Sequence, residues 1–313
     1  MRPKILLIGK NGQVGRELNA LLPRLGEVVA FDRQGLDLSN PGEVREAIRA
    51  LHPQFIVNAA AYTAVDRAES DECTARTVNA DAPGLMAAEA KRIGAILLHY
   101  STDYVFDGTK RTPYVEEDSP NPQNVYGRTK LAGEQAIQES GAAHLILRTA
   151  WVYAQQGKNF LLTILKLASQ RGELRIVRDQ IGAPTFSREI ATATSCILAN
   201  LSGDSSRMDD MPAISGIYHM TAAGETSWWE FARTILEEAS ASDQIPEWQA
   251  LATGGGPLVA QRVTPISSAE YPTPAARPLY SVLSNARLAR VFGVHLPDWR
   301  TQLRSVFKND PSR

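Results

Sequence analysis

The sequence predicts an α/β fold, in which a doubly wound parallel sheet is joined to a second, smaller, loop-rich lobe. Short apolar runs that do not alternate with polar residues predict strands buried on both faces, as in a parallel sheet. Helix-like segments separate these runs, which indicates right-handed crossovers. Residues 250–280 are rich in Gly and Pro, which suit loops and not sheet interiors. The last feature predicts the loop-rich lobe.

The order of the elements gives the expected domain boundaries. We expect a dinucleotide-binding domain of the Rossmann type over residues 1–180, to which the chain returns around 187–222, and a mainly substrate-binding lobe over 181–313. Strands are expected in K-I-L-L-I-G, V-V-A-F-D, F-I-V-N-A-A-A, A-I-L-L-H-Y-S-T-D, L-I-L-R-T-A-W-V-Y and G-I-Y-H-M. Helices are expected in G-Q-V-G-R-E-L-N-A-L-L, E-V-R-E-A-I-R-A-L, around 72–92, in a segment that opens with Tyr126 and Lys130, and in S-R-E-I-A-T-A-T-S-C-I-L-A-N-L. D-Q-I-G-A-P-T is expected to be a loop, and 202–215 an exposed connection.

Composition and charge exclude several classes of protein. The net charge of −1 gives no electrostatic case for nucleic acid or an anionic membrane surface as a partner. No apolar run approaches the length of a membrane span. Cys73 and Cys196 lie far apart and are expected to be thiols in a reducing compartment, and the five histidines are too scattered for a metal site. We therefore expect a cytoplasmic protein that is either a monomer or a weak homodimer.

Three glycines follow the first predicted strand and open the first predicted helix. Gly9, Gly12 and Gly15 lie in G-K-N-G-Q-V-G. A dinucleotide pyrophosphate needs a tight strand-to-helix turn, close approach of the backbone and a helix N-terminus directed at its charge. A purely structural turn is the alternative. The strand before and the helix after favour dinucleotide binding.

The second predicted strand ends in a pair of opposite charges. Asp32 lies where an acidic side chain binds the adenosine ribose hydroxyls of NADH. Arg33 follows directly and suits the 2′-phosphate of NADPH. Both residues are alternatively solvated turn residues. Because the pair argues for opposite cofactors, we predict that the protein uses both NADPH and NADH.

Three further residues form a candidate catalytic group. Thr102 ends a strand in H-Y-S-T-D-Y-V-F-D-G, and Tyr126 and Lys130 lie four residues apart, on one face of the next helix. Hydride delivery to a ketone builds negative charge on its oxygen, which requires a proton donor and a hydrogen-bond donor. A nearby ammonium and an oxidised nicotinamide are expected to favour the phenolate and so lower the tyrosine pKa from about 10. The alternatives are a half-buried aromatic at 126 and a solvated charge at 130. Asn79, in T-V-N-A-D, is equally explained as a helix-capping or buried polar side chain or as a catalytic relay.

The glycines, Thr102 and Tyr126-x-x-x-Lys130 together resemble the extended short-chain dehydrogenase/reductase superfamily. Six further motifs narrow the resemblance to the dTDP-4-dehydrorhamnose reductase family, in order from residue 4 to about 300. These motifs are N-A-A-A-Y-T-A-V-D-R-A-E-S, H-Y-S-T-D-Y-V-F-D-G, N-V-Y-G-R-T-K-L-A-G-E, R-T-A-W-V-Y, D-Q-x-G-A-P-T and Y-P-T-P-A-A-R-P.

The resemblance implies a role for each matching position, with a dTDP-sugar as substrate. Tyr126 would protonate the C4 oxygen of the sugar. Lys130 would lower the pKa of Tyr126 and hold the nicotinamide ribose, and Thr102 would hydrogen-bond the sugar. Asp103 and Trp151 match positions that contact the sugar, although Trp151 is equally explained as a core tryptophan. The other implied dinucleotide contacts are Gly12, Gln13 and Val14 at the pyrophosphate, Asp32 at the ribose, Asp37 and Leu38 at the adenine, and Ala61, Tyr62, Thr63 and Tyr100 elsewhere.

Some members of the family dimerise through a magnesium ion held by clustered glutamates. The first-helix position is Glu17 here, but Arg188 lies beside Glu189 and S-N-A-R-L near 285 has no acid. We therefore predict no structural metal.

Two other functions share these features. Nucleotide-sugar 4,6-dehydratases and epimerases share the fold, the glycine turn and the Tyr/Lys pair. Dehydratases carry the motif Thr-Asp-Glu, whereas this chain has Thr102-Asp103-Tyr104 at that position. A non-catalytic homologue, such as the regulatory subunit of eukaryotic methionine adenosyltransferase, is the second alternative. The missing glutamate and the intact Thr, Tyr and Lys favour a reductase.

Overall fold

The computed structural model describes residues 2–203, 211–241 and 245–308. Its centre is a six-stranded sheet of order β10-β5-β4-β3-β1-β2, in which every strand pair is parallel. The order reverses at β1, which creates a crevice between the carboxyl ends of β1 and β3. The doubly wound parallel sheet is thus confirmed. Its strands are β1 (Lys4–Ile8), β2 (Glu27–Phe31), β3 (Phe55–Asn58), β4 (Ile96–Thr102), β5 (His144–Thr149) and β10 (Gly216–His219).

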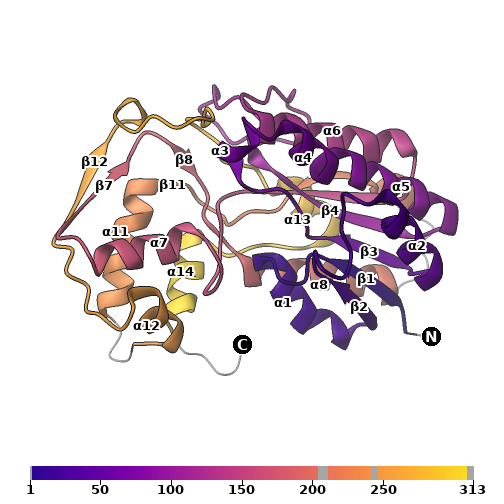
Figure 1. Ribbon diagram of the computed structural model, residues 1–313, viewed down its shortest axis with the longest axis horizontal. Helices are drawn as coiled ribbons and strands as arrows, with labels where there is room; N and C mark the ends of the chain where they lie inside the picture. Colours follow the sequence, from indigo (N-terminus) through magenta and orange to yellow (C-terminus); the bar gives the residue numbers. More distant parts are fainter. Residues whose placement is uncertain (1, 204–210, 242–244, 309–313) are drawn as a thin grey trace.

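Helices cover both faces of this sheet, as Figure 1 shows on its right-hand side. Apolar side chains of α2 (Pro41–Leu51), α5 (Ala82–Ile93) and α6 (Val125–Ser140) form the core on one face. Those of α1 (Gln13–Leu21), α8 (Ser187–Gly203) and α13 (Ala286–Phe292) form the core on the other. Residues from late in the chain therefore return to the sheet.

The long helical segment expected around 72–92 is present, with a change of pitch in the middle. It begins after α3 (Val65–Ala68) as α4 (Glu72–Arg76), widens into the π-helical turn η2 (Thr77–Asp81), and continues as α5. Turns of this kind often occur at functional sites. Here a Cβ at Gly133 of α6 would lie 2.1 Å from the Asn79 carbonyl oxygen, so the absence of a side chain lets α6 approach the turn.

A second, smaller group of elements lies on the left of Figure 1. A separate apolar core joins α7 (Phe160–Ala168), α11 (Trp228–Ala241), α12 (Glu247–Thr253) and α14 (Trp299–Phe307) with the parallel pair β7 (Glu173–Val177) and β12 (Arg262–Ile266). The stretch expected to be a loop at D-Q-I-G-A-P-T contains short pairings instead. There β8 (Ile181–Gly182) pairs with β11 (Thr226–Ser227), and β9 (Thr185–Phe186) pairs with β6 (Val152–Tyr153).

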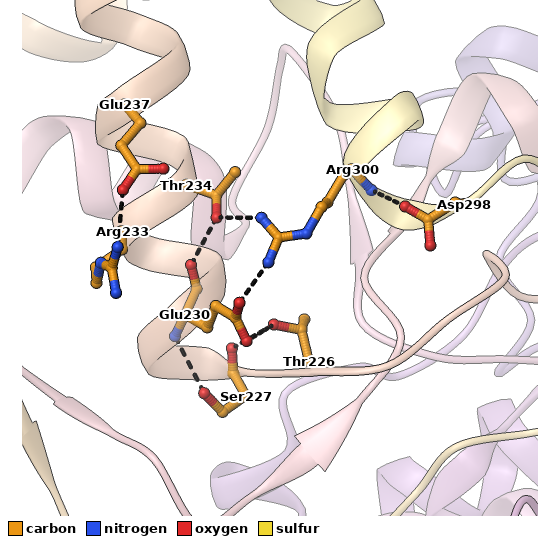
Figure 2. A network of polar contacts seen from close by, with 8 residues as sticks. All are labelled: Thr226, Ser227, Glu230, Arg233, Thr234, Glu237, Asp298 and Arg300. Carbon is orange, nitrogen blue, oxygen red and sulfur yellow. Dashed lines mark hydrogen bonds and ion pairs between the residues drawn. The ribbon is translucent and has the colours of Figure 1, made fainter.

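Polar contacts hold α11 and α14 of this smaller lobe together, as Figure 2 shows. The Arg300 guanidinium forms an ion pair with Glu230 and donates to the Thr234 hydroxyl at 3.4 Å. Glu230 in turn accepts from the Thr226 hydroxyl at 3.3 Å, which links β11 to the same network. These contacts connect β11, α11 and α14.

The remaining elements are short. They are the 3-10 turns η1 (Leu22–Arg24), η3 (Asp103–Val105) and η4 (Ser268–Glu270), and the helix α10 (Met211–Ile214). The exposed connection expected at 202–215 lies mostly outside the described residues. None of the helices in the described ranges has the length and apolar character needed to cross a membrane. Cys73 and Cys196 are both exposed free thiols.

Candidate active site

One cavity of about 810 Å³ lies along the carboxyl edge of the sheet. It brings together most of the residues that the sequence predicts for a dinucleotide site. Four predicted residues, Gly15, Thr102, Asp103 and Trp151, are not part of its lining. The predicted residues that line it are Gly9, Gly12, Gln13, Val14, Asp32, Arg33, Asp37, Leu38, Ala61, Tyr62, Thr63, Tyr100, Tyr126 and Lys130.

The glycine turn joins β1 to α1 at the centre of this cavity. Gly9 has a φ of +90°, and a Cβ there would lie 2.7 Å from the Ala60 backbone nitrogen. A Cβ at Gly15 would lie 2.0 Å from the Gly9 carbonyl oxygen. Gly12 is the N-cap of α1, so free backbone amides of the first helical turn face the cavity. Gly9 and Gly15 therefore permit close packing, and the turn presents an anion-binding helix end.

Asp32 follows β2 and is held in place by several donors. Its carboxylate accepts from the backbone amides of Gln34 and Gly35, both at 3.1 Å, and from the Asn11 side chain at 2.8 Å. Lys10 Nζ lies 3.9 Å away. These contacts, the Gly35 amide first, lower the pKa of Asp32. The carboxylate is thus ionised and fixed at the cavity wall.

Beyond Asp32 the wall becomes more exposed. Arg33 is exposed and lines the cavity. Asp37 accepts from the Ser39 amide at 3.0 Å, which lowers the pKa of its carboxyl group, while Leu38 is buried. This end therefore combines fixed negative charge, an exposed positive charge and an apolar surface.

Tyr62 and the loop around it are anchored by Asn79. The Asn79 side chain accepts from the Tyr62 amide at 2.9 Å and donates to the Tyr62 carbonyl at 3.1 Å and to the Thr129 hydroxyl at 3.2 Å. Asn79 is completely buried. Of the two alternatives for this residue, the contacts favour a buried polar side chain that positions the loop.

Thr102 and Tyr126 meet where β4 ends and α6 begins. The Asn124 side chain caps α6 by accepting from the Gly127 amide at 2.8 Å, which fixes Tyr126 in the first turn. Burial raises the pKa of Tyr126 to about 12, and a hydrogen bond with Thr102 opposes the rise. The expected lowering of this pKa by Lys130 is not found in this structure, because loss of hydration raises the pKa and the charge of Asp103 raises it further. Tyr126 is therefore fully protonated at neutral pH.

Lys130 lies one turn further along α6 and is also buried, at 1% exposure. Its Nζ lies 2.6 Å from the Tyr100 carbonyl oxygen and 3.0 Å from His99 Nε2. Burial lowers its pKa to about 8, against an opposing effect of Glu134. The alternative of a solvated helix charge at this position is therefore wrong, since the face shared by Tyr126 and Lys130 is turned inward.

Asp103 follows Thr102 at the end of β4 and is 2% exposed. Its Oδ1 accepts from the Thr102 hydroxyl at 3.1 Å, and its Oδ2 has no hydrogen-bond partner. Burial raises the pKa of Asp103 to about 6, while hydrogen bonds from Ser281 and Thr102 oppose the rise. Tyr104 packs edge-on against Tyr126, with ring centroids 5.6 Å apart.

Trp151 adopts an unusual backbone conformation, with φ +48°. Its ring stacks on Trp228 of α11 at a centroid distance of 3.5 Å and an interplanar angle of 6°. A Cβ at Gly182 would lie 2.4 Å from the Trp151 ring, so the ring also packs against β8. Trp151 is partly buried, and its contacts with Trp228 and Gly182 connect the end of β5 to the smaller lobe.

Other cavity residues were not anticipated from the sequence. The segment 154–158 covers the start of α1, where Gln156 contacts Arg16 and Lys158 lines the cavity. Nothing in the spacing of this segment indicates such a position. Asn11, by contrast, lies within the glycine turn and could have been identified by its place there. His99 and Asn58 lie outside the cavity lining and are completely buried, in stretches for which the sequence predicts strands alone.

The position considered for a magnesium ligand is engaged in an ion pair. The Glu17 carboxylate lies 3.2 Å from Arg188 Nε. Throughout the ranges that the structure describes, no group of three or more His, Cys, Asp or Glu side chains could hold a metal ion.

Comparison with known proteins places this site in context. Residues 2–311 match the family described as RmlD substrate binding domain. A dTDP-4-dehydrorhamnose reductase of Burkholderia thailandensis is 49% identical over 95% of each chain, and one of Escherichia coli K12 is 42% identical over 96% of each chain. The crystal structure of a Bacillus anthracis dTDP-4-dehydrorhamnose reductase in complex with NADP superposes with a TM-score of 0.84 at 32% identity, over 98% of this chain and 99% of that one.

Proposed function

The chain belongs to the RmlD substrate binding domain family, that of the dTDP-4-dehydrorhamnose reductases, and from this premise we propose how its residues act. The reaction is the transfer of a hydride from NADPH or NADH to the C4 ketone of dTDP-4-dehydro-L-rhamnose, which gives dTDP-L-rhamnose. The observation that carries the proposal is the buried group of Thr102, Tyr126 and Lys130 beside a cavity suited to a dinucleotide.

The dinucleotide supplies the hydride, and the protein supplies the proton and the hydrogen bonds at C4. The Tyr126 hydroxyl donates its proton to the C4 oxygen as negative charge develops there. A pKa of about 12 keeps this hydroxyl protonated at neutral pH, which is the state that a reduction requires. Thr102 orients the phenol and offers a second donor to the oxygen. Lys130 stabilises the phenolate left behind and holds the nicotinamide ribose.

The dinucleotide is proposed to lie along the cavity from β2 to α6. The turn from Gly9 to Gly15, with Gln13 and Val14, would hold the pyrophosphate at the N-terminus of α1. Asp32, Arg33, Asp37 and Leu38 would bind the adenosine half. Ala61, Tyr62, Thr63 and Tyr100 would line the remainder.

The sugar is proposed to bind between Tyr126 and the smaller lobe. Asp103 offers an unpartnered buried oxygen, and Trp151 offers a partly exposed ring at the junction with α11. The segment Y-P-T-P-A-A-R-P closes this side, since Asn124 donates to the Ala276 carbonyl at 2.8 Å and Arg277 pairs with Asp66 at 2.8 Å.

The two alternatives receive less support. A 4,6-dehydratase needs an additional acid–base group beside the sugar, and the position after Asp103 holds Tyr104, whose ring packs against Tyr126. A non-catalytic homologue gives no reason for a Tyr/Lys pair buried beside the dinucleotide cavity.

The division into two units remains a proposal about binding. We assign the nucleotide to the sheet and its helices, including 187–222, and the sugar mainly to residues after 180. The shared apolar core of α7, β7, α11, α12 and α14 supports placing 160–177 with the sugar-binding lobe as well. We further propose a cytoplasmic monomer or weak homodimer.

The experiment mixes the purified protein with NADPH and dTDP-4-dehydro-L-rhamnose and follows nicotinamide absorbance. Stoichiometric oxidation with formation of dTDP-L-rhamnose is expected. An epimerase would change the sugar without net oxidation, and a non-catalytic homologue would do neither. Omission of the sugar is the control for unproductive oxidation.

A further inference from the structure

The Trp151 ring is held by two residues of the smaller lobe. One face of the ring stacks on Trp228, the first residue of α11, with ring centroids 3.5 Å apart and an interplanar angle of 6°. Gly182 of β8 packs against the same ring, since a Cβ there would lie 2.4 Å from Trp151 Cε2 and 2.8 Å from its Nε1. The mechanism above assigns no role to Trp228 or Gly182.

Trp228 and Gly182 belong to one short ribbon of two strands. β8 and β11 pair antiparallel, with Gly182 opposite Thr226. Trp228 directly follows Ser227, the last residue of β11. The Trp151 ring therefore meets both residues as parts of a single unit, and a displacement of this ribbon would change both contacts together.

The network in Figure 2 holds this ribbon to α11 and α14. The Ser227 hydroxyl accepts from the Glu230 amide at 3.1 Å, and the Thr226 hydroxyl donates to the Glu230 carboxylate at 3.3 Å. Arg300 of α14 pairs with the same carboxylate. These contacts surround Trp228 in the sequence and fix the backbone from which its ring projects.

The Trp228 ring also packs into the apolar core of the smaller lobe. Its centroid lies 4.4 Å from that of Phe160 in α7 and 6.4 Å from that of Phe231 in α11. Trp228 is therefore held both at its backbone and at its ring, and it offers Trp151 a fixed surface.

The conformation of Trp151 makes such a surface necessary. Its φ of +48° lies in the left-handed region, which residues with a side chain rarely adopt and which persists only where surrounding contacts hold it. The Thr185 amide donates to the Trp151 carbonyl at 3.2 Å, which holds the backbone. The ring is only partly buried, so its orientation depends on the contacts with Trp228 and Gly182.

We propose that Trp228 and Gly182, together the tryptophan clamp, are positioning residues that hold the Trp151 ring in the orientation in which it contacts the sugar of the substrate. A side chain that adopts its binding orientation only part of the time lowers the apparent affinity in proportion to that fraction. The tryptophan clamp removes this loss. The effect on sugar binding rests on the proposed function, whereas the effect on the orientation of Trp151 does not.

Trp228→Leu removes the stack and keeps an apolar side chain. The dissociation constant for dTDP-L-rhamnose and the KM for dTDP-4-dehydro-L-rhamnose should both rise by about three- to tenfold, as expected for the loss of one aromatic pair. The kcat should change little. Titration calorimetry should show unchanged affinity for NADPH and for dTDP, which lacks the sugar. Trp228→Phe keeps a stacking ring and should recover most of the lost affinity.

Trp229→Leu is the matched control, because it removes the next tryptophan of the same helix. Trp229 Nε1 donates to the Val263 carbonyl at 2.9 Å, and the Arg233 guanidinium lies 5.1 Å from the Trp229 ring. These contacts belong to the smaller lobe alone. The affinity for dTDP-L-rhamnose should therefore remain that of the wild type.

Gly182→Ala tests the tryptophan clamp even where the Trp228 variants fold poorly. The new Cβ would overlap the Trp151 ring, so the ring must move. The gain in affinity that the sugar gives dTDP-L-rhamnose over dTDP should fall here as well. Gly172→Ala is its control, since nothing lies within 4 Å of a Cβ at that position.

Fluorine NMR measures the orientation of Trp151 without any ligand. With 5-fluorotryptophan at all five tryptophans, the Trp151 signal is assigned by its loss in Trp151→Phe. This signal should shift in Trp228→Leu, because the neighbouring ring is lost, and should stay in place in Trp229→Leu.

Three results would overturn the proposal. They are an unshifted Trp151 signal in Trp228→Leu, an unchanged difference in affinity between dTDP-L-rhamnose and dTDP in the folded variants, and an equal loss of affinity for NADPH, which would show a purely structural role. A wild type that binds dTDP-L-rhamnose no more tightly than dTDP would instead refute the sugar contact of Trp151 itself, and with it the purpose of the tryptophan clamp.

Discussion

The two ends of the cavity differ in how their polar groups are held. At the adenosine end, Asp32 and Asp37 are partly exposed, and backbone amides lower their pKa values. At the reaction end, Tyr126 and Lys130 are buried, and loss of hydration moves both pKa values toward the uncharged form. The first arrangement favours the ionised carboxylates, and the second favours the uncharged forms of the tyrosine and the lysine.

The two ends of the cavity therefore serve different purposes: the adenosine end recognises the dinucleotide, and the other end carries out the reaction. A fixed, hydrated charge discriminates between dinucleotides by a small electrostatic difference that salt weakens. A desolvated hydroxyl or amine instead controls a proton in the transition state, where one group can account for a large part of the rate. Substitutions at the reaction end should therefore have much larger effects than those at the adenosine end.

The largest effect is expected for Tyr126→Phe. Loss of the proton donor should reduce kcat by roughly 10²- to 10⁴-fold, because the C4 oxygen then lacks its acid. Dinucleotide affinity, measured by nicotinamide fluorescence, should change little. Tyr104→Phe, which removes a neighbouring buried hydroxyl, is the matched control and should keep most of its turnover. Comparable kcat values for Tyr126→Phe and the wild type would contradict the assigned mechanism.

Asp103→Asn tests the energetic cost of burial at the same end. The folded-state pKa of Asp103 is raised from 3.8 to about 6, so its ionised form destabilises the fold, and this cost grows as pH rises through that interval. The variant should be more stable than the wild type at neutral pH, by up to about 3 kcal/mol, and no more stable near the ordinary carboxyl pKa. Denaturant unfolding at both pH values measures the difference.

Asp107→Asn supplies a control of opposite sign. Hydrogen bonds, that from the Thr109 amide first, lower the pKa of Asp107 to about 2. Its ionised form therefore stabilises the fold above the ordinary carboxyl pKa, and this stabilisation is lost as pH falls toward 2. Asp107→Asn should be less stable than the wild type at neutral pH. The same sign of change for both variants would refute the distinction between them.

Gly15→Ala tests the glycine turn between the two ends. The new Cβ would lie 2.0 Å from the Gly9 carbonyl oxygen, so the turn must move. We expect NADPH and NADH to bind roughly tenfold more weakly, the equivalent of about 1.4 kcal/mol. Gly172→Ala is the control, since nothing lies within 4 Å of a Cβ at that position. Equal affinity in Gly15→Ala, by fluorescence titration, would place the pyrophosphate elsewhere.

The smallest effect is expected for Asp32→Asn. Removing its charge should increase the preference for NADPH over NADH by about two- to fivefold, as expected for an exposed charge. Arg33→Ala should shift the preference the other way, because it removes a cation suited to the 2′-phosphate. The ratio of kcat/KM values for the two dinucleotides measures both, and a shift of both variants in one direction would disprove the assignment.

The sequence was sufficient for the sheet and for much of the cavity. Buried parallel strands have a distinctive apolar pattern, and their carboxyl ends necessarily share one edge, which placed the glycine turn, Asp32 and Tyr126 together. The spacing of Tyr126 and Lys130 correctly indicated a shared helical face.

The protonation states of Tyr126 and Lys130 could not be predicted from their spacing. The pKa of Tyr126 depends on how much hydration is lost, which is a property of packing among β4, α6 and their neighbours. The polar contacts of His99 in β4 could not be predicted either, because its partners come from β3 and α6. The stacking of Trp151 on Trp228 likewise joins residues far apart in the chain.

Isotope transfer tests the central claim most directly. NADPH carrying deuterium at the transferred position is incubated with the protein and dTDP-4-dehydro-L-rhamnose, and the product sugar is examined by NMR. The account predicts dTDP-L-rhamnose with deuterium on C4 and one equivalent of dinucleotide oxidised. A product without deuterium at C4, or a changed sugar with no dinucleotide oxidised, would contradict it.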